Sequence, residues 1–370
     1  MASTVLGAAL VAAAAACGGG EGPPGAVALT DGPWAIATGA EPAVFDAGFA
    51  GARLTYTIEG VGGTPVEVTG IVGVPDGDPP DGGWPVVAWA HGTSGIADAC
   101  APSVDGDGGG SNGVVGAVVD RGFVVAATDY EGLGGDGLHP YLDGRSEARS
   151  VAGAVAAAAE VLAVPLADRW LVYGGSQGGH AALFTAELGS DAVPGMTLIG
   201  AAAAAPVTDL RANTAAAASD FAGGVQALLL AGLLERQPAI DPATLLTDAG
   251  VAAVATAATG CSGDLLGVEA PLLVAGADEP GTPYGDLLDA AGVAQVATDV
   301  PILVAMGTAD LTVPAAATAE AVERMCALGD VVELRAYEGE GHLEVLQSSA
   351  ADVLAWTIDR FAGEPAPSTC

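Results

Sequence analysis

Val-Tyr-Gly-Gly-Ser-Gln-Gly-Gly, residues 172–179, places Ser176 in a G-x-S-x-G pattern directly after an apolar run. In this pattern a strand turns sharply into a helix, so the serine hydroxyl is exposed above the edge of a sheet. The neighbouring segments suit that geometry, because residues 170–173 favour a strand and residues 178–188 favour a helix. The sequence therefore predicts a strand–turn–helix unit with Ser176 at the turn, followed later in the chain by an acid and a histidine.

Short apolar runs alternate with alanine-rich segments along most of the chain. Continuous runs of this kind are typical of strands that helices cover on both faces of a parallel sheet. We expect such strands at residues 85–90, 123–128, 170–173, 196–203, 301–306 and 331–337, and an initial antiparallel pair at residues 53–58 and 64–74. Helical segments such as residues 147–162 lie between them. The alternation predicts an α/β fold with a mainly parallel sheet of eight strands.

An alanine- and leucine-rich stretch, residues 206–295, interrupts this alternation between the sixth and seventh expected strands. A connection of that length needs structure and purpose of its own. Residues 221–234 within it favour a buried or amphipathic helix. We interpret the stretch as a mostly helical cap, inserted into one domain that covers residues 31–370.

The composition is strongly acidic. Asp and Glu number 45, the ten basic residues are all arginines, and the net charge is -35. Such a surface repels nucleic acid and anionic lipid headgroups, because the electrostatic attraction that those partners need has the wrong sign. We expect no nucleic-acid partner, and a hydrophobic content of 51% indicates a folded chain with a large core.

The N-terminus resembles an export signal over residues 1–17. Its apolar stretch, residues 5–16, is too short to span a bilayer. Ala14-Ala15-Ala16-Cys17 resembles a loose bacterial lipobox, which predicts lipidation of Cys17, membrane attachment and a flexible tether over residues 18–30. A basic segment does not precede the apolar stretch, and alanine stands where leucine is usual, so export without a lipid anchor is the alternative. Either way we expect an extracellular or cell-envelope protein.

A serine hydroxyl needs a base within hydrogen-bond reach to become a nucleophile. The chain has four histidines, and only His342 follows both Ser176 and a suitable acid, just after the last expected strand. His342 is therefore the predicted base. His180 lies one helical turn beyond Ser176 and is predicted to be a packed residue, and His139 before a proline is predicted to be a loop residue.

Asp310 is the predicted acid, because it comes just after the expected strand at residues 301–306. There it can orient His342 and stabilise the imidazolium that forms during attack. The order serine, aspartate, histidine is that of α/β hydrolases. Rival carboxylates are Asp264 and Asp278 in the cap and Asp129 ahead of the nucleophile.

The donors of an oxyanion hole are expected at two backbone positions. One is the N–H of Gln177, directly after the nucleophile, and the other belongs to the loop after an earlier strand. That loop is His91-Gly92-Thr93, and we assign its donor to Thr93, with Gly92 as the alternative.

Several segments together resemble the secretory lipase family of α/β hydrolases. They are Ala90-His-Gly-Thr93, Ala127-Thr-Asp-Tyr-Glu-Gly-Leu-Gly134, His139-Pro-Tyr-Leu142, Gly174-Gly-Ser-Gln-Gly-Gly179 and Gly307-Thr-Ala-Asp310. The similarity covers about residues 30–370. It implies the α/β-hydrolase fold and a serine ester hydrolase, an esterase or lipase, with Ser176, Asp310 and His342 as the catalytic triad.

Beyond Cys17 the chain has four cysteines, an even set that suits two disulfides in an oxidising compartment. The residues alone permit three pairings. The family resemblance implies Cys100 with Cys261 and Cys326 with Cys370.

The same triad and fold also serve peptidases, amidases and acyltransferases. An aminopeptidase would need a carboxylate for the substrate amine, whereas an esterase for lipids needs an apolar tunnel. The alanine and leucine content of residues 221–234 favours the tunnel. We expect a small-molecule ester or lipid substrate, no metal or organic cofactor, and a monomer.

Overall fold

The computed structural model describes residues 27–30, 35–45, 47–104, 111–216, 221–269 and 271–370. The predicted export signal, Cys17 and residues 18–26 of the predicted tether lie outside the described residues. The last residues of that tether run along the end of a helix, where Thr30 N donates to Val161 O at 2.7 Å and Ala163 N donates to Ala28 O at 3.1 Å. Residues 28–30 are therefore hydrogen-bonded to the main domain.

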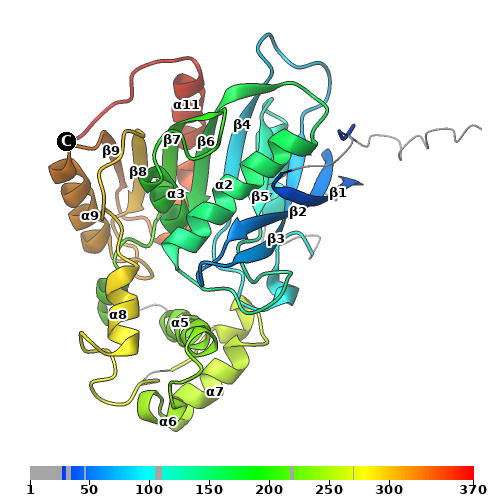
Figure 1. The fold of residues 1–370 in the computed structure, drawn as a ribbon. Coiled ribbons are helices and arrows are strands. Elements are labelled where there is room, and N and C mark those ends of the chain that lie inside the picture. The colour runs from blue at the N-terminus through cyan, green and yellow to red at the C-terminus, as the bar shows by residue number, and fades with distance from the viewer. Residues whose placement is uncertain (1–26, 31–34, 46, 105–110, 217–220, 270) are drawn as a thin grey trace, which may run out of the picture.

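A nine-stranded sheet forms the centre of the main domain, with the strand order β1-β2-β3-β5-β4-β6-β7-β8-β9 (Figure 1). The antiparallel start comprises β1 (Ala37–Val44), β2 (Ala50–Glu59) and β3 (Pro65–Val74), and β3 also pairs antiparallel with β5. The prediction of eight strands was wrong, because it missed β1 and the sheet has nine. β1 is an edge strand that contains alanines, a glycine and a proline, so it carries little of the pattern that marks a strand.

The other six strands pair in parallel with one another. They are β4 (Trp84–Ala90), β5 (Val124–Thr128), β6 (Leu166–Gly175), β7 (Thr197–Ala204), β8 (Ile302–Gly307) and β9 (Val332–Tyr337). Each overlaps a predicted strand. Parallel pairing brings the carboxyl ends of these strands to one edge of the sheet, where the turns after β4, β6, β8 and β9 meet.

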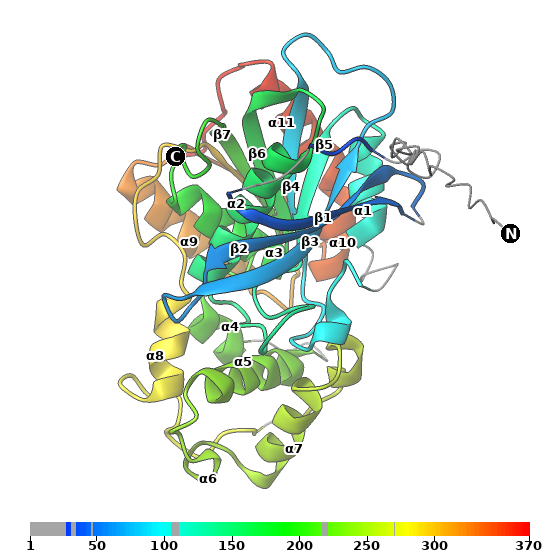
Figure 2. The same cartoon turned by 45° about the vertical axis from the view of Figure 1, so that its right-hand side comes forward.

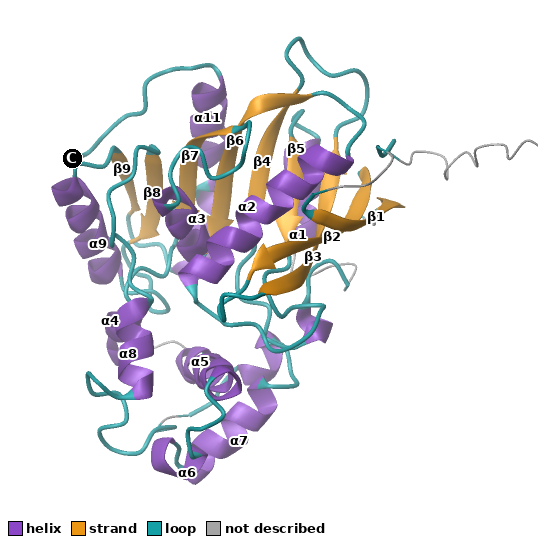
Figure 3. Ribbon diagram, in the orientation of Figure 1, coloured by secondary structure: helices purple, strands orange, loops and turns teal. Residues whose placement is uncertain are grey.

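Helices cover both faces of this sheet (Figures 2 and 3). One face carries α2 (Gly144–Val161), α3 (Gln177–Glu187) and α9 (Ala315–Leu328), and the other carries α1 (Ser111–Val119), α10 (His342–Ser348) and α11 (Ala350–Phe361). Neighbouring strand residues alternate between the two layers: Val172 packs with the first layer, and Leu171 packs with Trp356 of α11. Burial on both faces explains why the strands read as continuous apolar runs.

Residues between β7 and β8 form a separate helical lobe, seen below the sheet in Figure 1. It comprises α4 (Leu210–Ala216), α5 (Ala222–Arg236), α6 (Pro242–Leu245), α7 (Asp248–Ala257), the short 3-10 helix η3 (Ser262–Leu265) and α8 (Pro283–Ala290). We call this lobe the cap. Its leucines pack around α5 and against Ile96, Tyr141 and Leu142 of the main domain. No helix within the described residues is long and apolar enough to cross a membrane.

Two disulfides join distant parts of the chain. Cys326 at the end of α9 is bonded to Cys370, which holds the C-terminal segment beside β9. Cys100 is bonded to Cys261, 161 residues away in the cap. The pairing is the one that the family resemblance implies.

Candidate active site

Ser176 lies at the turn between β6 and α3. Its φ of 56° and ψ of -118° fall outside the usual regions for a residue with a side chain, as expected for a strained strand-to-helix turn. The flanking glycines permit this turn because they have no Cβ. A Cβ on Gly178 would lie 1.9 Å from the Ala90 carbonyl oxygen, and one on Gly174 would lie 2.1 Å from the Gly178 oxygen. Close contact of Gly178 with the backbone of β4, and of Gly174 with Gly178 across the turn, therefore explains the spacing of the motif.

The three residues of the predicted triad come together at this edge of the sheet. His342 Nε2 lies 2.9 Å from Ser176 Oγ, and His342 Nδ1 lies 2.7 Å from Asp310 Oδ2. The side chain of His342 is 11% exposed and that of Asp310 is 3% exposed. Ser176 is itself half-buried and lines a cavity, whereas the carboxylate behind the histidine is shielded from water.

Backbone groups orient the acid. The other oxygen of Asp310, Oδ1, accepts hydrogen bonds from Thr312 N and Val313 N, both at 2.8 Å. The remaining oxygen is thereby directed at His342. A carboxylate held by such bonds can keep the imidazole in one orientation and tautomer during proton transfer.

The rival carboxylates are engaged elsewhere. Asp129 is buried and accepts hydrogen bonds from Thr69 Oγ1, at 2.6 Å, and from Ser103. Asp264 accepts from the backbone of Cys261 in the cap.

The loop after β4 lies beside the nucleophile, as the oxyanion assignment requires. A Cβ placed on Gly92 would lie 3.3 Å from Gly175 O and 3.8 Å from Ser176 Cβ. Thr93 Oγ1 shares a hydrogen bond of 2.7 Å with the hydroxyl of Tyr141, which fixes the threonine side chain. Burial raises the pKa of Tyr141, so its hydroxyl stays protonated. The second candidate donor is the N–H of Gln177, in the first turn of α3, where N–H groups have no partner inside the helix.

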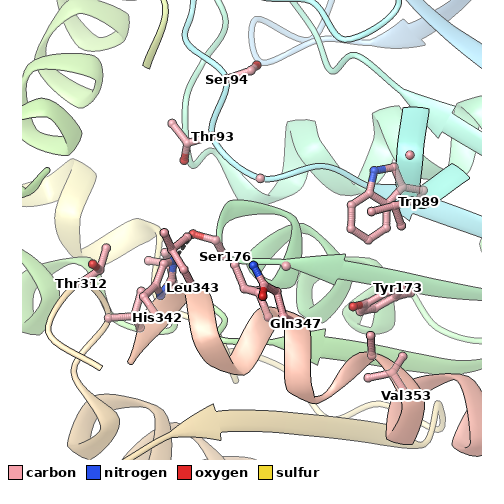
Figure 4. A pocket seen from close by; sticks show the side chains of 18 of the residues that line it. Trp89, Thr93, Ser94, Tyr173, Ser176, Thr312, His342, Leu343, Gln347 and Val353 are labelled. Carbon is pink, nitrogen blue, oxygen red and sulfur yellow. Dashed lines mark hydrogen bonds between the residues drawn. The ribbon is translucent and has the colours of Figure 1, made fainter. Parts of the chain in front are cut away.

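A cavity of about 1170 Å³ opens at Ser176 and His342 (Figure 4). On the cap side its walls include Phe221, Val225 and Leu266, and on the other side they include Trp89, Tyr173 and Leu346. Within the described structure no Asp or Glu lines this cavity, although the chain has 45 of them. The surface that a substrate meets is therefore mainly apolar, and none of its described residues offers an anionic group to bind an ammonium.

The cap is joined to the loop after β4, close to Thr93. Besides the Cys100–Cys261 disulfide, Gly95 pairs with Cys261 in an isolated bridge, and Ser262 N donates to Ser94 O at 2.8 Å. Gly95 has a φ of 138°, and a Cβ there would lie 2.6 Å from Cys100 Sγ. Only glycine fits where the two segments touch.

The side chains of His180 and His139 are buried, and their ring nitrogens bond to groups other than Ser176. The backbone N–H of His180 donates to Ser176 O at 3.1 Å, within the first turn of α3. His139, however, bonds to the side chain of Gln177, and His180 bonds to Glu147. Sequence reasoning missed this connection. There is little signal for it in the sequence, because Glu147 stands beside Arg145, Ser146 and Arg149 in the polar start of α2.

Metal-binding groups are absent from the described part of the chain: no three or more His, Cys, Asp or Glu side chains are placed to hold one ion.

The mainly parallel sheet, the strained serine turn and the aligned histidine and aspartate define the class of α/β hydrolases. Within that class, the model of one family, described as secretory lipase, matches residues 111–369. The chain belongs to this family and is a carboxylic ester hydrolase. The family and the two disulfides indicate an exported protein.

Solved structures with the same fold include two hydrolases. Candida antarctica lipase A in its closed state has a TM-score of 0.76 and 18% identity, over 89% of this chain and 83% of that chain. The rice cell wall degrading esterase LipA from Xanthomonas oryzae, in a ligand-bound form, has a TM-score of 0.73 and 22% identity, over 85% of this chain and 91% of that chain. At these identities the likeness concerns the fold. No curated protein sequence matches the chain.

Proposed function

We propose that the chain hydrolyses acyl esters of short to medium length through a Ser176–His342–Asp310 triad and an acyl-enzyme. The observation that carries this proposal is the unbroken chain of hydrogen bonds from Asp310 through His342 to Ser176, at the wall of an apolar cavity. A hydroxyl in that position can lose its proton to the imidazole as it attacks.

In the proposed mechanism Ser176 Oγ attacks the ester carbonyl carbon while its proton passes to His342 Nε2. The carbonyl oxygen becomes an oxyanion, which the N–H groups of Gln177 and Thr93 stabilise. His342 then protonates the alcohol oxygen as the C–O bond breaks, leaving the acyl group on Ser176. A water molecule, deprotonated by His342, attacks the acyl-enzyme and releases the carboxylic acid.

The cavity supports an apolar ester as the substrate. Phe221 and Val225 on the cap side and Trp89 on the other side can bury hydrocarbon, and burial of apolar surface stabilises by about 25 cal/mol per Å². A cationic amine would find no carboxylate among the described lining residues. This favours an esterase or lipase over an aminopeptidase.

The test is a rate series on p-nitrophenyl esters of two to sixteen carbons, run with the wild type and with Ser176→Ala. We expect a short- to medium-chain optimum and a loss of activity in the variant of roughly a millionfold. Ser190→Ala is the matched control, because Ser190 lies beyond α3 and bonds to Asp299 instead. Wild-type turnover in Ser176→Ala would disprove the nucleophile assignment.

The alternative acyl chemistries are tested with the same enzyme. A p-nitroanilide of the best acyl group measures amide hydrolysis, and added short alcohols measure acyl transfer. We expect the ester to be cleaved far faster than the anilide, and hydrolysis to dominate in water. Faster anilide cleavage would favour the peptidase or amidase alternative, and ester exchange at low alcohol concentration would favour an acyltransferase.

We further propose that export ends with a lipid anchor on Cys17. The support is the sequence alone, Ala14-Ala15-Ala16-Cys17 after an apolar stretch. Cys17→Ser is expected to move the protein from the membrane fraction to the medium. Retention of the variant in the membrane fraction would contradict lipidation.

A further inference from the structure

Four fully buried polar side chains lie behind the nucleophile turn and take no part in the proposed reaction. His139 belongs to the loop after β5, Glu147 to the first turn of α2, and Gln177 and His180 to the start of α3. Each has 0% of its surface exposed. Burying polar and charged groups costs free energy unless they are paired, so we expect these four side chains to bond to one another or to the backbone.

The hydrogen bonds of His180 show that it is a cation. Its Nδ1 lies 2.6 Å from Glu147 Oε2, and its Nε2 lies 3.0 Å from Ala291 O. A carboxylate and a carbonyl oxygen both accept, so beside an ionised Glu147 both ring nitrogens carry protons. Burial lowers the pKa of His180, but the charge and hydrogen bond of Glu147, together with the bond to Ala291 and the charge of Asp143, outweigh burial and raise it. Glu147 and His180 therefore form a buried ion pair.

The hydrogen bonds of His139 show that it is neutral. Its Nδ1 donates to Glu131 O at 2.9 Å, which leaves Nε2 as an acceptor. Burial lowers the pKa of this side chain to about 4. Its Nε2 can therefore accept a hydrogen bond from Gln177.

The amide of Gln177 is held between these two groups. Gln177 Nε2 donates to Glu147 Oε1 at 2.9 Å and to His139 Nε2 at 2.7 Å, so both of its N–H bonds are used. Its Oε1 has no hydrogen-bond partner within the described structure. The amide is thus held through its nitrogen alone, and the carboxylate decides its orientation.

Gln177 is also the residue whose backbone N–H is proposed to stabilise the oxyanion. It directly follows Ser176, whose φ of 56° is strained. A strained turn persists only where surrounding contacts hold it, and an oxyanion donor acts only when it is already in place. Through its side chain, Gln177 is hydrogen-bonded to Glu147 and His139, and these bonds can fix the position of its backbone.

We propose that Glu147 is a positioning residue for the oxyanion hole: it holds the Gln177 side chain and thereby places the Gln177 N–H. His180 balances the charge of the buried Glu147 carboxylate. The His180 bond to Ala291 also joins this cluster to the segment where the cap returns to the main domain. This inference rests on the proposed function.

The test is the isosteric change Glu147→Gln in the full chain. We expect kcat to fall by roughly ten- to a hundredfold, less than the hundred- to thousandfold cost of losing an oxyanion donor. KM and the preferred acyl length should stay unchanged, because the cavity is untouched. Ser176 Oγ adds to the carbonyl carbon of a trifluoromethyl ketone, and the adduct carries an oxyanion. The Ki of such a ketone should therefore rise by the same factor by which kcat falls. The Ki of the matching methyl ketone should not change.

A double-mutant cycle tests the route through Gln177. Gln177→Met keeps the backbone N–H but removes the side-chain amide and adds no buried charge. We expect it to lower kcat by a similar factor, and the double variant to be no worse than Glu147→Gln alone. If the two losses multiply, Glu147 acts by another route and the proposal is wrong. If Glu147→Gln does not fold, Gln177→Met decides alone, and wild-type kcat in that variant overturns the proposal.

Glu187→Gln is the matched control, since Glu187 ends the same helix and accepts hydrogen bonds from Ala294 N and Gln295 N. It should lower stability and leave kcat unchanged. Full activity in folded Glu147→Gln would refute this inference and leave the triad intact, provided that Ser176→Ala is inactive. Activity in Ser176→Ala would instead refute the proposed function.

Discussion

Two carboxylate–histidine pairs lie at opposite ends of the first turn of α3, and their geometry is nearly the same. His342 Nδ1 lies 2.7 Å from Asp310, and His180 Nδ1 lies 2.6 Å from Glu147. The difference is the partner of the other ring nitrogen. For His342 it is the hydroxyl of Ser176, and for His180 it is the carbonyl oxygen of Ala291.

A hydroxyl can donate a proton, and a carbonyl cannot. His342 can therefore be neutral and receive the serine proton, whereas His180 already carries two protons and has nothing to take up. Exposure differs in the same sense, because the side chain of His342 is 11% exposed and that of His180 is fully buried. A carboxylate–histidine pair alone does not make a general base. The group bonded to the second ring nitrogen decides whether the histidine can take up a proton.

The largest expected effect comes from removing each histidine in turn. His342→Gln should lower kcat by roughly a millionfold, as the loss of the base does in serine hydrolases with a triad. His180→Gln should keep most of the chemistry but lower the free energy of unfolding by about 3–5 kcal/mol, because Glu147 loses its counter-charge. Turnover numbers and urea unfolding curves measure the two effects. Equal losses of kcat in both variants would contradict the distinction.

The next largest effect on kcat is expected from Asp310→Asn. An amide at position 310 leaves the shape unchanged but favours the wrong imidazole tautomer, which typically costs about ten-thousandfold in kcat. We expect KM to remain near that of the wild type. Burst kinetics with a p-nitrophenyl ester would show whether acylation is the slowed step.

The third prediction concerns pH and His139. The pKa of buried His139 is about 4, below its ordinary value, so the unfolded chain binds a proton more readily than the folded one between pH 6.5 and about 4. The folded state should therefore lose about 3 kcal/mol of stability from this residue as pH falls through that window. For His180, whose pKa is raised, the sign is opposite: its contribution is complete below pH 6.5 and is lost as pH rises through the raised pKa.

Urea unfolding from pH 4 to alkaline pH measures how the free energy of unfolding changes with pH for both residues. The stability of His139→Gln should depend less on pH below 6.5 than that of the wild type. The stability difference between wild type and His180→Gln should shrink at alkaline pH. If His139→Gln had the wild-type acid slope, His139 would not be the residue that titrates.

The smallest expected effect is that of Tyr141→Phe. This change removes the hydroxyl that bonds to Thr93 Oγ1 at 2.7 Å. A net hydrogen bond is worth about 1 kcal/mol, so we expect a loss of roughly fivefold in kcat. A change confined to KM would indicate that the contact serves substrate binding and has no part in placing the oxyanion loop.

The parts of the fold with a strong local pattern could be predicted from the sequence. Buried parallel strands such as β8 (sequence ILVAMG) are apolar along their length, and the glycines beside Ser176 predict its turn. The order of acid and base followed from the same motif. Edge strand β1, in contrast, has one exposed face and weak strand formers, so its pairing with β2 decides its structure.

The second carboxylate–histidine pair could not be predicted, for a different reason. Glu147 resembles one of 45 acidic residues, most of which a solvated surface would hold. Its burial depends on α2 packing against α3, which brings position 147 beside position 180. Sequence patterns report the period of a helix but not which partner a polar residue meets across a helix interface.

The link between Cys100 and Cys261 has a mechanical consequence. Together with the Gly95–Cys261 bridge and the Ser262–Ser94 hydrogen bond, it fastens one corner of the cap to the strand-end loop that carries Thr93. Displacement of the cap at this corner would therefore also displace residues 93–95. Reduction of the disulfide would leave the bridge, the hydrogen bond and the apolar contacts of the cap in place, so it would loosen this corner without releasing the cap.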